Sequence, residues 1–219
     1  MSVDYNNFAK TFSNSRKNMK WEEIKYFLSF LEGKKDLSIL DIGCGNGRLL
    51  GELKKTSQDI KSYLGIDLSS ELLNEAKNIY PDDNFQELNM LDINTLHNKY
   101  NVIFFIASFH HLDKIEDRIK VLKQANNLLL DGGMIFMTNW SLNSELNKKR
   151  YNDAIISGSE NDFGSLDYNI KLGGNDRYYH SFDLKELEYL FKETGFEVIE
   201  NREFENKKNF ISIIKKTGD

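Results

Sequence analysis

The sequence contains little cysteine and little proline, with one residue of each among 219. The lone thiol, Cys44, cannot close an internal disulfide, which favours a reducing compartment. No apolar run approaches the ~20 residues that a membrane-spanning helix needs. The first residues have neither the basic start nor the apolar core of a secretory signal. We therefore expect a cytoplasmic protein that does not span a membrane.

The chain also lacks an excess of positive charge. Its net charge of −5 argues against a protein that binds nucleic acid through its overall charge. Hydrophobic residues at 40% and charged residues at 29% are typical of a globular domain, and 219 residues suffice for one domain with a real core. The local basic clusters, interpreted first as solvated surface, are Lys34-Lys35, Lys148-Lys149-Arg150, Lys207-Lys208 and Lys215-Lys216.

Apolar runs that suit strands alternate with helical patterns along most of the chain. Strands are predicted at 37–42, 63–66, 85–88, 101–107, 134–138, 196–203 and 209–215. Helices are predicted after Trp21, Gly47 and Ser69, and behind capping pairs at Asp113/Glu116 and Asp183/Glu186. The alternation predicts a single three-layer α/β domain, Rossmann-like and mostly parallel, with an antiparallel C-terminal strand.

Two segments fall outside this alternation. Residues 141–180 are polar and aperiodic apart from one short helix near 143–156, and are predicted to be an insertion on the substrate side of the sheet. Residues 1–33 are predicted to form an N-terminal helical lid.

The first strand runs into three glycines at alternate positions, Gly43, Gly45 and Gly47. This strand–turn–helix pattern is typical of nucleotide sites, because glycine lets the backbone approach a ligand closely. Asp41 stands two residues before the first glycine, where its charge would repel a pyrophosphate held at the next helix. A ligand with a cationic head and no phosphate would be attracted instead. S-adenosylmethionine, with an amino group and a sulfonium, fits this pattern better than a dinucleotide.

Other candidate residues follow later strands, where ligands bind in such sheets. Asp67 stands 20 residues after Gly47, the spacing of an acid that accepts hydrogen bonds from ribose. Asn89 and the backbone N–H of Met90 could read the edge of adenine, while the Met90 side chain packs on its face. The small Ala107 leaves room for a methionine moiety.

His110 and His111 follow the fourth strand. Sequence neighbours seldom share one ion, and no third ligand stands at zinc spacing, so no metal site is expected. At least one of the pair is expected to be structural, and His110 is the candidate that faces the substrate. Ser108 lacks a nucleophile elbow, and Cys44 is interpreted as a packing residue.

These motifs resemble a known family. Asp41-Ile-Gly-Cys-Gly-Asn-Gly47, Asp67 and the fourth-strand His-His-Leu resemble class I S-adenosylmethionine-dependent methyltransferases over nearly the whole chain. The absence of a Pro-Pro-aromatic loop disfavours the amino-methylating enzymes of nucleic acids.

A narrower resemblance lies near both ends. Phe12-Ser13-Asn14-Ser15-Arg16 with Trp21, and Arg177-Tyr178-Tyr179-His180-Ser181-Phe182 with Glu186-Leu187, are similar to the tRNA methyltransferases that esterify 5-carboxymethyluridine at the wobble position. The methyltransferase domain of AlkB-homologue tRNA hydroxylases belongs to the same group. Lys208-Asn209-Phe210 resembles that group's Gly-Asn-Trp strand, whereas residues 141–176 match nothing in it.

The resemblance implies that Arg16 closes over the carboxylate end of the cofactor and that Arg177 and Tyr178 face the acceptor, with His110 shaping the pocket. From the residues alone, the Arg-Tyr-Tyr-His run either holds an anion or forms a buried aromatic cluster. The residues expected at the cofactor are Arg16, Asp41, Gly43, Cys44, Gly45, Asn46, Gly47, Asp67, Leu68, Asn89, Met90, Ile106 and Ala107.

The expected reaction is methyl transfer to a carboxylate of a modified wobble uridine in tRNA. A small-molecule O- or N-methyltransferase is the alternative, which the acidic net charge favours. A non-catalytic cofactor-binding subunit is a further alternative. If tRNA is the substrate, we expect either a small basic protein partner or a basic groove built from the clusters above.

Overall fold

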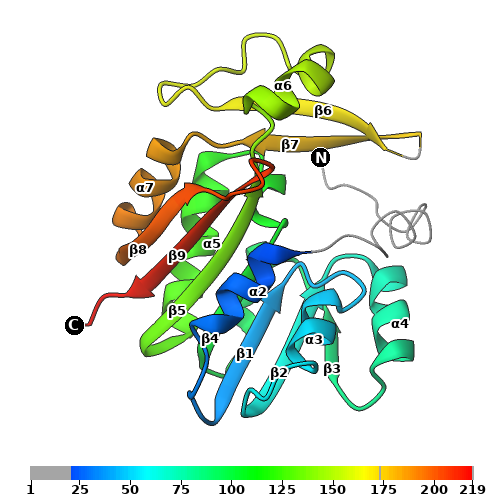
Figure 1. Cartoon of the computed structure of the whole chain (residues 1–219), viewed down its shortest axis with the longest axis vertical. Helices are drawn as coiled ribbons and strands as arrows, with labels where there is room; N and C mark the ends of the chain where they lie inside the picture. The colour runs from blue at the N-terminus through cyan, green and yellow to red at the C-terminus, as the bar shows by residue number, and fades with distance from the viewer. Residues whose placement is uncertain (1–20, 173, 219) are drawn as a thin grey trace.

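The computed structural model describes residues 21–172 and 174–218. The fold consists of a seven-stranded sheet and a separate two-stranded sheet. Helices cover both faces of the larger sheet, and the hairpin lies beyond one end of it (Figure 1). The strand order is β3-β2-β1-β4-β5-β9-β8, and only β9 runs against its neighbours. The predicted three-layer, mostly parallel architecture with an antiparallel C-terminal strand is confirmed.

The strands of the sheet are β1 (Leu37–Ile42), β2 (Ile60–Asp67), β3 (Asn84–Glu87), β4 (Tyr100–Ile106), β5 (Leu129–Trp140), β8 (Phe196–Glu203) and β9 (Asn209–Lys216). The hairpin pairs β6 (Leu166–Leu172) with β7 (Asn175–Ser181). The helices are α2 (Glu22–Ser29), α3 (Arg48–Leu53), α4 (Ser70–Ile79), α5 (Ile115–Leu128), α6 (Glu145–Tyr151) and α7 (Leu184–Glu193), with short 3-10 turns η2 (Met90–Thr95), η3 (Phe109–His111) and η4 (Asn152–Ala154).

The central strand β4 explains why the sheet needs two helical layers. Its side chains alternate between two cores, with Ile103 and Phe105 in one and Val102 and Phe104 in the other. All four are buried, as expected for a parallel strand covered on both faces. Helices α5 and α7 cover the first core, and α2, α3 and α4 cover the second.

The capping predictions divide into confirmed and wrong ones. Ser69 accepts a hydrogen bond from Leu72 N at the start of α4, and Asp183 accepts one from Lys185 N at the start of α7. The Glu186 half of that second capping pair is wrong, because Asp183 N donates to Ser165 Oγ and the Glu186 carboxylate binds other partners. The capping box at Asp113 is wrong, because α5 starts at Ile115 after Lys114, whose side chain makes no cap. The Asp113 carbonyl instead accepts a hydrogen bond from Arg118.

Residues 141–180 are more ordered than their composition predicts. The predicted short helix is present as α6, but the β6–β7 hairpin was missed. Strand β6 does alternate apolar and polar residues, with Leu166, Tyr168 and Ile170 on one face, and this period-2 signal was overlooked, whereas β7 has no such apolar row. The hairpin lies across the carboxyl edge of the sheet (Figure 1), which is where the predicted insertion belongs.

None of the helices in the described part of the chain has the length and apolar character needed to cross a bilayer.

Candidate active site

The glycine turn after β1 is tied to the neighbouring strands. Gly43 N and Cys44 N both donate to the Ile66 carbonyl, at 2.8 and 3.0 Å. Gly43 has φ +79°, and a Cβ added to it would lie 2.4 Å from Ser108 Cβ. Only glycine satisfies both the positive φ and this close approach. The turn is therefore fixed against the loop that follows β4.

That loop contains a second unusual backbone conformation. Ala107 has φ +53°, a region that non-glycine residues rarely adopt. Its N–H donates to the Oγ1 and the carbonyl of Thr138, at 2.9 and 3.1 Å. Strained backbone held in this way is typical of functional sites, and Ala107 lines the cavity described next.

A cavity of about 780 Å³ opens at the carboxyl edge, between the glycine turn, the loop after β4 and the hairpin. Eight of the residues predicted at the cofactor line it: Asp41, Gly43, Cys44, Gly45, Asn46, Asp67, Ile106 and Ala107. His110 and Arg177 line it as well.

Asp41 supplies buried negative charge to this cavity. It is 1% exposed; Tyr63 donates to its Oδ2 at 2.9 Å, and its Oδ1 has no hydrogen-bond partner within the described ranges. Burial raises the pKa of Asp41 to about 7, against the Tyr63 hydrogen bond and with a contribution from the charge of Asp67. An unsatisfied buried carboxylate oxygen fits a ligand that brings an ammonium group or another cation.

A second cavity of about 970 Å³ lies beside the first, and Gly43, Asp67 and His111 line both. Leu68, Asn89 and Met90, all predicted at the cofactor, line the second cavity, and the contact of Asn89 and Met90 with adenine stays a prediction. Asn89 Oδ1 accepts a hydrogen bond from Leu91 N at 2.9 Å, which fixes the loop in place. The paired cavities therefore suit an extended ligand with a cationic end and a flat, mostly apolar end, and the residues present fit S-adenosylmethionine.

Asp67 lies between the two cavities, and its carboxylate links two segments of their shared wall by hydrogen bonds. Its Oδ2 accepts from Gly45 N at 2.8 Å, and its Oδ1 accepts from Ser69 N at 2.9 Å. Burial raises the pKa of Asp67 in spite of these backbone hydrogen bonds. Its position between the cavities is compatible with the predicted contact to ribose, which stays a prediction.

Within the described part of the chain, Gly47 is the predicted cofactor residue that lines neither cavity. Gly47 starts α3 with φ +79°, and a Cβ there would meet Tyr80 at 3.1 Å and Phe85 at 3.3 Å. Its glycine is required for close helix packing, so the prediction of cofactor contact does not agree with its position. Arg16 lies outside the described residues.

The two adjacent histidines are held by backbone groups in opposite ways. Trp140 N donates to His110 Nδ1 at 3.2 Å, whereas His111 Nδ1 lies 3.0 Å from the Tyr178 carbonyl. These partners assign the Nδ1 of His110 as an acceptor and the Nδ1 of His111 as a donor. Both rings line the first cavity. In the described part of the chain no cluster of ligands could hold a metal ion.

Strand β7 divides the Arg-Tyr-Tyr-His run between its two faces. Arg177 and Tyr179 line the first cavity, and Tyr179 stacks on Trp140 with ring centroids 5.0 Å apart. Arg177 is 1% exposed, and its guanidinium lies 5.6 Å from the Tyr179 ring centroid. The buried aromatic cluster is present and contains Arg177, and the binding of an anion by this cation stays a prediction.

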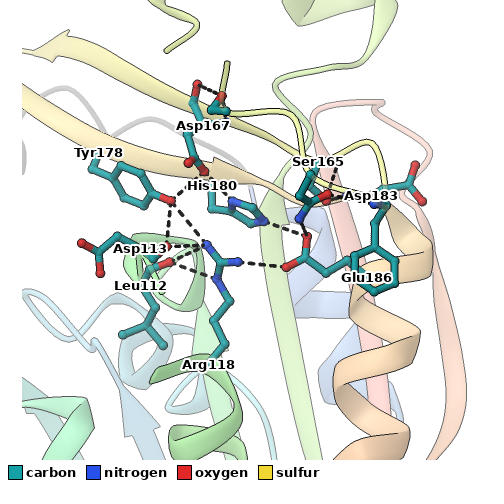
Figure 2. A network of polar contacts seen from close by, with 12 residues as sticks. Leu112, Asp113, Arg118, Ser165, Asp167, Tyr178, His180, Asp183 and Glu186 are labelled. Atoms are coloured by element: carbon teal, nitrogen blue, oxygen red, sulfur yellow. Dashed lines mark hydrogen bonds and ion pairs between the residues drawn. The ribbon is translucent and has the colours of Figure 1, made fainter. Parts of the chain in front are cut away.

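Tyr178 and His180 point to the opposite face, because side chains alternate along a strand. Figure 2 shows both in a polar network rather than at the cavity. Tyr178 donates to Asp167 Oδ1 at 2.7 Å, and this bond and burial raise the pKa of its hydroxyl. The prediction that Tyr178 faces the acceptor therefore does not agree with its position.

The network continues through His180 and Glu186 to Asp167 and Arg118, two residues that the sequence analysis did not identify. His180 lies between Asp167, at 2.6 Å from its Nδ1, and Glu186, at 2.8 Å from its Nε2. Arg118 pairs with the other Glu186 oxygen at 2.9 Å and also donates to the Leu112 carbonyl (Figure 2). Arg118 stands in the buried stripe of α5 with Val121, Leu122 and Ala125, and this i, i+3, i+4, i+7 spacing is the signal that could have identified it.

The comparison with known families agrees with this geometry. The sequence model of a methyltransferase domain family matches residues 15–201. A protein of Encephalitozoon cuniculi, whose name assigns it provisionally to the methyltransferases, is 26% identical over 197 residues, covering 90% of this chain and 87% of that one.

A second relative carries a more specific name. The tRNA (carboxymethyluridine(34)-5-O)-methyltransferase of Saccharomyces cerevisiae is 28% identical over 152 residues, covering 69% of this chain and 51% of the yeast protein. The chain thus matches about half the length of that relative.

Among solved structures, a S-adenosylmethionine-dependent methyltransferase from Clostridium acetobutylicum superposes with a TM-score of 0.73 at 18% identity, over 98% of this chain and 99% of that one. The likeness is one of fold. Because the family model spans most of the sequence and the strand order, glycine turn and paired cavities agree with it, the chain belongs to the methyltransferase family.

Proposed function

We propose that this protein transfers a methyl group from S-adenosylmethionine to a carboxylate oxygen of a 5-carboxymethyluridine-type nucleoside at the wobble position of tRNA. The cofactor is supported by the paired cavities and by the buried anion Asp41 in one of them. The substrate is supported by the yeast relative, at 28% identity, and by the motifs around Arg16 and Arg177.

The observation that carries the proposal is the pair of opposite charges in the wall of one cavity. Asp41 and Arg177 are both 1% exposed, and both line the cavity beside Ala107. A buried carboxylate attracts the ammonium group of the methyl donor. A buried guanidinium attracts an anion and binds a carboxylate through a planar pair of donors.

The proposed acceptor also fits the absence of an assigned general base. A carboxylate is ionised at pH 7 and needs no proton removed before it attacks. When bound, S-adenosylmethionine supplies the electrophilic methyl group, and the acceptor oxygen gains the methyl as the carbon–sulfur bond breaks. Arg177 orients the acceptor, and His110 shapes the pocket. The stacked rings of Tyr179 and Trp140 exclude water from one side. Alignment of this kind can lower a barrier by ~7–11 kcal/mol.

The proposal is tested by the destination of a labelled methyl group. Purified protein is incubated with labelled S-adenosylmethionine and either bulk tRNA or a metabolite extract, each taken from cells that lack this gene. The expected result is label in tRNA that is released by mild alkali, because an ester hydrolyses there and an N-methyl group does not. Label confined to the extract would assign a small-molecule methyltransferase instead, and alkali-stable label in tRNA would exclude the carboxylate as acceptor.

The need for a small basic protein partner in the reaction on tRNA stays a prediction. Assays with and without a cell lysate lacking tRNA test it. Stimulation of transfer by a heat-labile, protease-sensitive component would support a partner subunit, and full activity of the purified chain would make one unnecessary.

A further inference from the structure

A separate groove adjoins the active-site cavity and shares Trp21 and Trp140 with it. The groove encloses about 1280 Å³. Helix α6 contributes Asn147, Arg150 and Tyr151 to one side. The turn between β8 and β9 contributes Asn206, Lys208 and Asn209 to the other. A chain that enters the groove can therefore continue into the cavity where the acceptor is expected.

The groove brings together two basic clusters that are about 60 positions apart in the sequence. Lys148, Lys149 and Arg150 lie on α6, and Lys207 and Lys208 lie in the β8–β9 turn; all five side chains are exposed. Backbone contacts hold the two segments side by side. Ser141 N donates to the Lys208 carbonyl at 2.9 Å, and Ser144 Oγ donates to the Lys207 carbonyl at 3.2 Å.

A buried carboxylate of α2 also holds the turn between β8 and β9 in place. Glu23 of α2 is 2% exposed, and its Oε1 accepts hydrogen bonds from Asn206 Nδ2 at 2.7 Å and Asn209 Nδ2. Lys208 therefore projects from a turn with a fixed backbone, which reduces the entropy lost when the groove binds a ligand. Glu22, the other acid in the lining, is exposed.

The local charge is opposite to that of the whole chain. Arg150 and Lys208 lie in the lining, and Lys148, Lys149 and Lys207 flank them on the same two segments. On a protein whose net charge is −5, these five exposed cations outnumber the exposed acids of the lining and of the same two segments, Glu22, Glu145 and Glu205. The half-buried aromatic side chains of Tyr151 and Trp140 lie among them in the lining. Cations next to aromatic faces are the combination that binds single-stranded nucleic acid, in which phosphates meet the charges and bases stack on the rings.

We infer that this basic groove holds the phosphate backbone of RNA next to the acceptor nucleoside, with Arg150 and Lys208 at the phosphates and Tyr151 under a base. The inference rests on the proposed function for the identity of the acceptor. An acidic protein is the other polyanion that such a groove could take. It is disfavoured because it would not use the aromatic lining or the continuity with the cavity.

The test is equilibrium binding of an unmodified anticodon stem-loop RNA, measured by fluorescence anisotropy between about 50 and 200 mM salt. Relative to the unmodified protein, Arg150→Gln/Lys208→Gln should weaken binding roughly tenfold and reduce the slope of log affinity against log salt by about 1.5, because two phosphate contacts are lost. Glu22→Gln should strengthen binding, because it removes an anion from the lining. The matched control is Lys34→Gln/Lys35→Gln, two exposed lysines at the amino edge of the sheet, and it should change neither quantity.

Equal loss in the control and groove variants, or no loss in the groove variant, would overturn the inference. Competition by polyglutamate at the same charge concentration as RNA would assign the groove to an acidic protein and overturn it too. Binding of S-adenosylhomocysteine by calorimetry verifies that each variant is folded. Because the readout is binding rather than transfer, salt-dependent RNA binding without methylation would refute the proposed acceptor alone. Methylation of tRNA that is unaffected by Arg150→Gln/Lys208→Gln would refute the groove alone.

Discussion

Arg118 of α5 and Glu186 of α7 form a buried ion pair, with Nη1 2.9 Å from Oε1 and side chains 4% and 0% exposed. The pair joins two helices that cover the same face of the sheet, and through His180 and Tyr178 it also fixes one face of strand β7. The other face of that strand presents Arg177 and Tyr179 to the cavity. The position of Arg177, the cation proposed to bind the acceptor, therefore depends on a charge network on the opposite face of β7.

Removing one member of this pair should be costly. Glu186→Gln leaves the Arg118 guanidinium buried without its counter-charge, and we expect a loss of about 3 kcal/mol in the free energy of unfolding. The matched control is Glu188→Gln on the same helix, because Glu188 pairs with Lys192 at 2.8 Å on the exposed face. The control should lose less than about 0.5 kcal/mol. Urea unfolding measures both, and similar losses would contradict the assigned role of the buried pair.

The same network predicts acid sensitivity. Burial alone would raise the pKa of Glu186, but hydrogen bonds and charge from His180, with help from Ser165 and Asn161, lower it from 4.5 to about 2. The stabilisation is thus complete above pH 4.5 and is lost as the pH falls from there toward 2. The difference corresponds to about 3 kcal/mol. Asp167, whose pKa is lowered by His180 and Tyr178 against its burial, acts in the same direction.

Unfolding free energies measured across this pH range check the prediction. The unmodified protein should lose stability more steeply than Glu186→Gln, in which the titrating group is absent. Parallel curves for the two proteins would show that Glu186 does not titrate as expected.

Asp41 should destabilise the fold and support cofactor binding. Its pKa is raised from 3.8 to about 7, chiefly by burial, so the folded protein holds a proton that the unfolded chain has released. Stability attributable to this group therefore falls as the pH rises from about 4 to 7, by about 4 kcal/mol at most. Asp41→Asn keeps an acceptor for the Tyr63 hydroxyl and should be more stable than the unmodified protein at pH 8.

Cofactor affinity should change in the opposite direction. Calorimetry at pH 8 should show binding of S-adenosylmethionine weakened at least tenfold in Asp41→Asn, because the ligand's cation loses its counter-charge. Retained affinity in this variant would refute the electrostatic reason for preferring this cofactor.

The glycine turn offers a matched pair of substitutions. Gly43→Ala combines a φ of +79° with a Cβ 2.4 Å from Ser108 Cβ, and should cost about 3 kcal/mol or more and prevent cofactor binding. Gly158→Ala has a similar φ of +74° but nothing within 4 Å, and should cost only the ~1–2 kcal/mol of backbone strain. Thermal unfolding and calorimetry separate the two, and equal costs would mean that the approach to Ser108 is unimportant.

The cofactor and acceptor sites should separate by mutation. Asp67→Ala removes the carboxylate between the cavities and should weaken cofactor binding, whereas Arg177→Ala should leave that binding within about threefold and abolish transfer. Calorimetry with S-adenosylhomocysteine and a transfer assay measure the two quantities. If Arg177→Ala lost cofactor affinity while Asp67→Ala kept it, the two sites would be misassigned.

The sequence by itself determined the sheet and its helices, and most of the residues that it predicts at the cofactor line the two cavities. Strand periods, the glycine turn and Asp41 are local features, because each is encoded by residues that are neighbours in the sequence. The residues predicted at the two cavities belong to short segments that each end a strand. In a parallel sheet those ends meet at one edge.

Only the tertiary structure decided which side of β7 each residue faces, that Gly47 serves packing, and that Arg118, His180 and Glu186 form one network. It also placed the clusters at 148–150 and 207–208 across one groove. These relationships join segments far apart in the chain, and no local pattern encodes them. They arise because buried charges must find partners, and the partner is whichever residue the packing of the sheet and helices brings within a few ångströms.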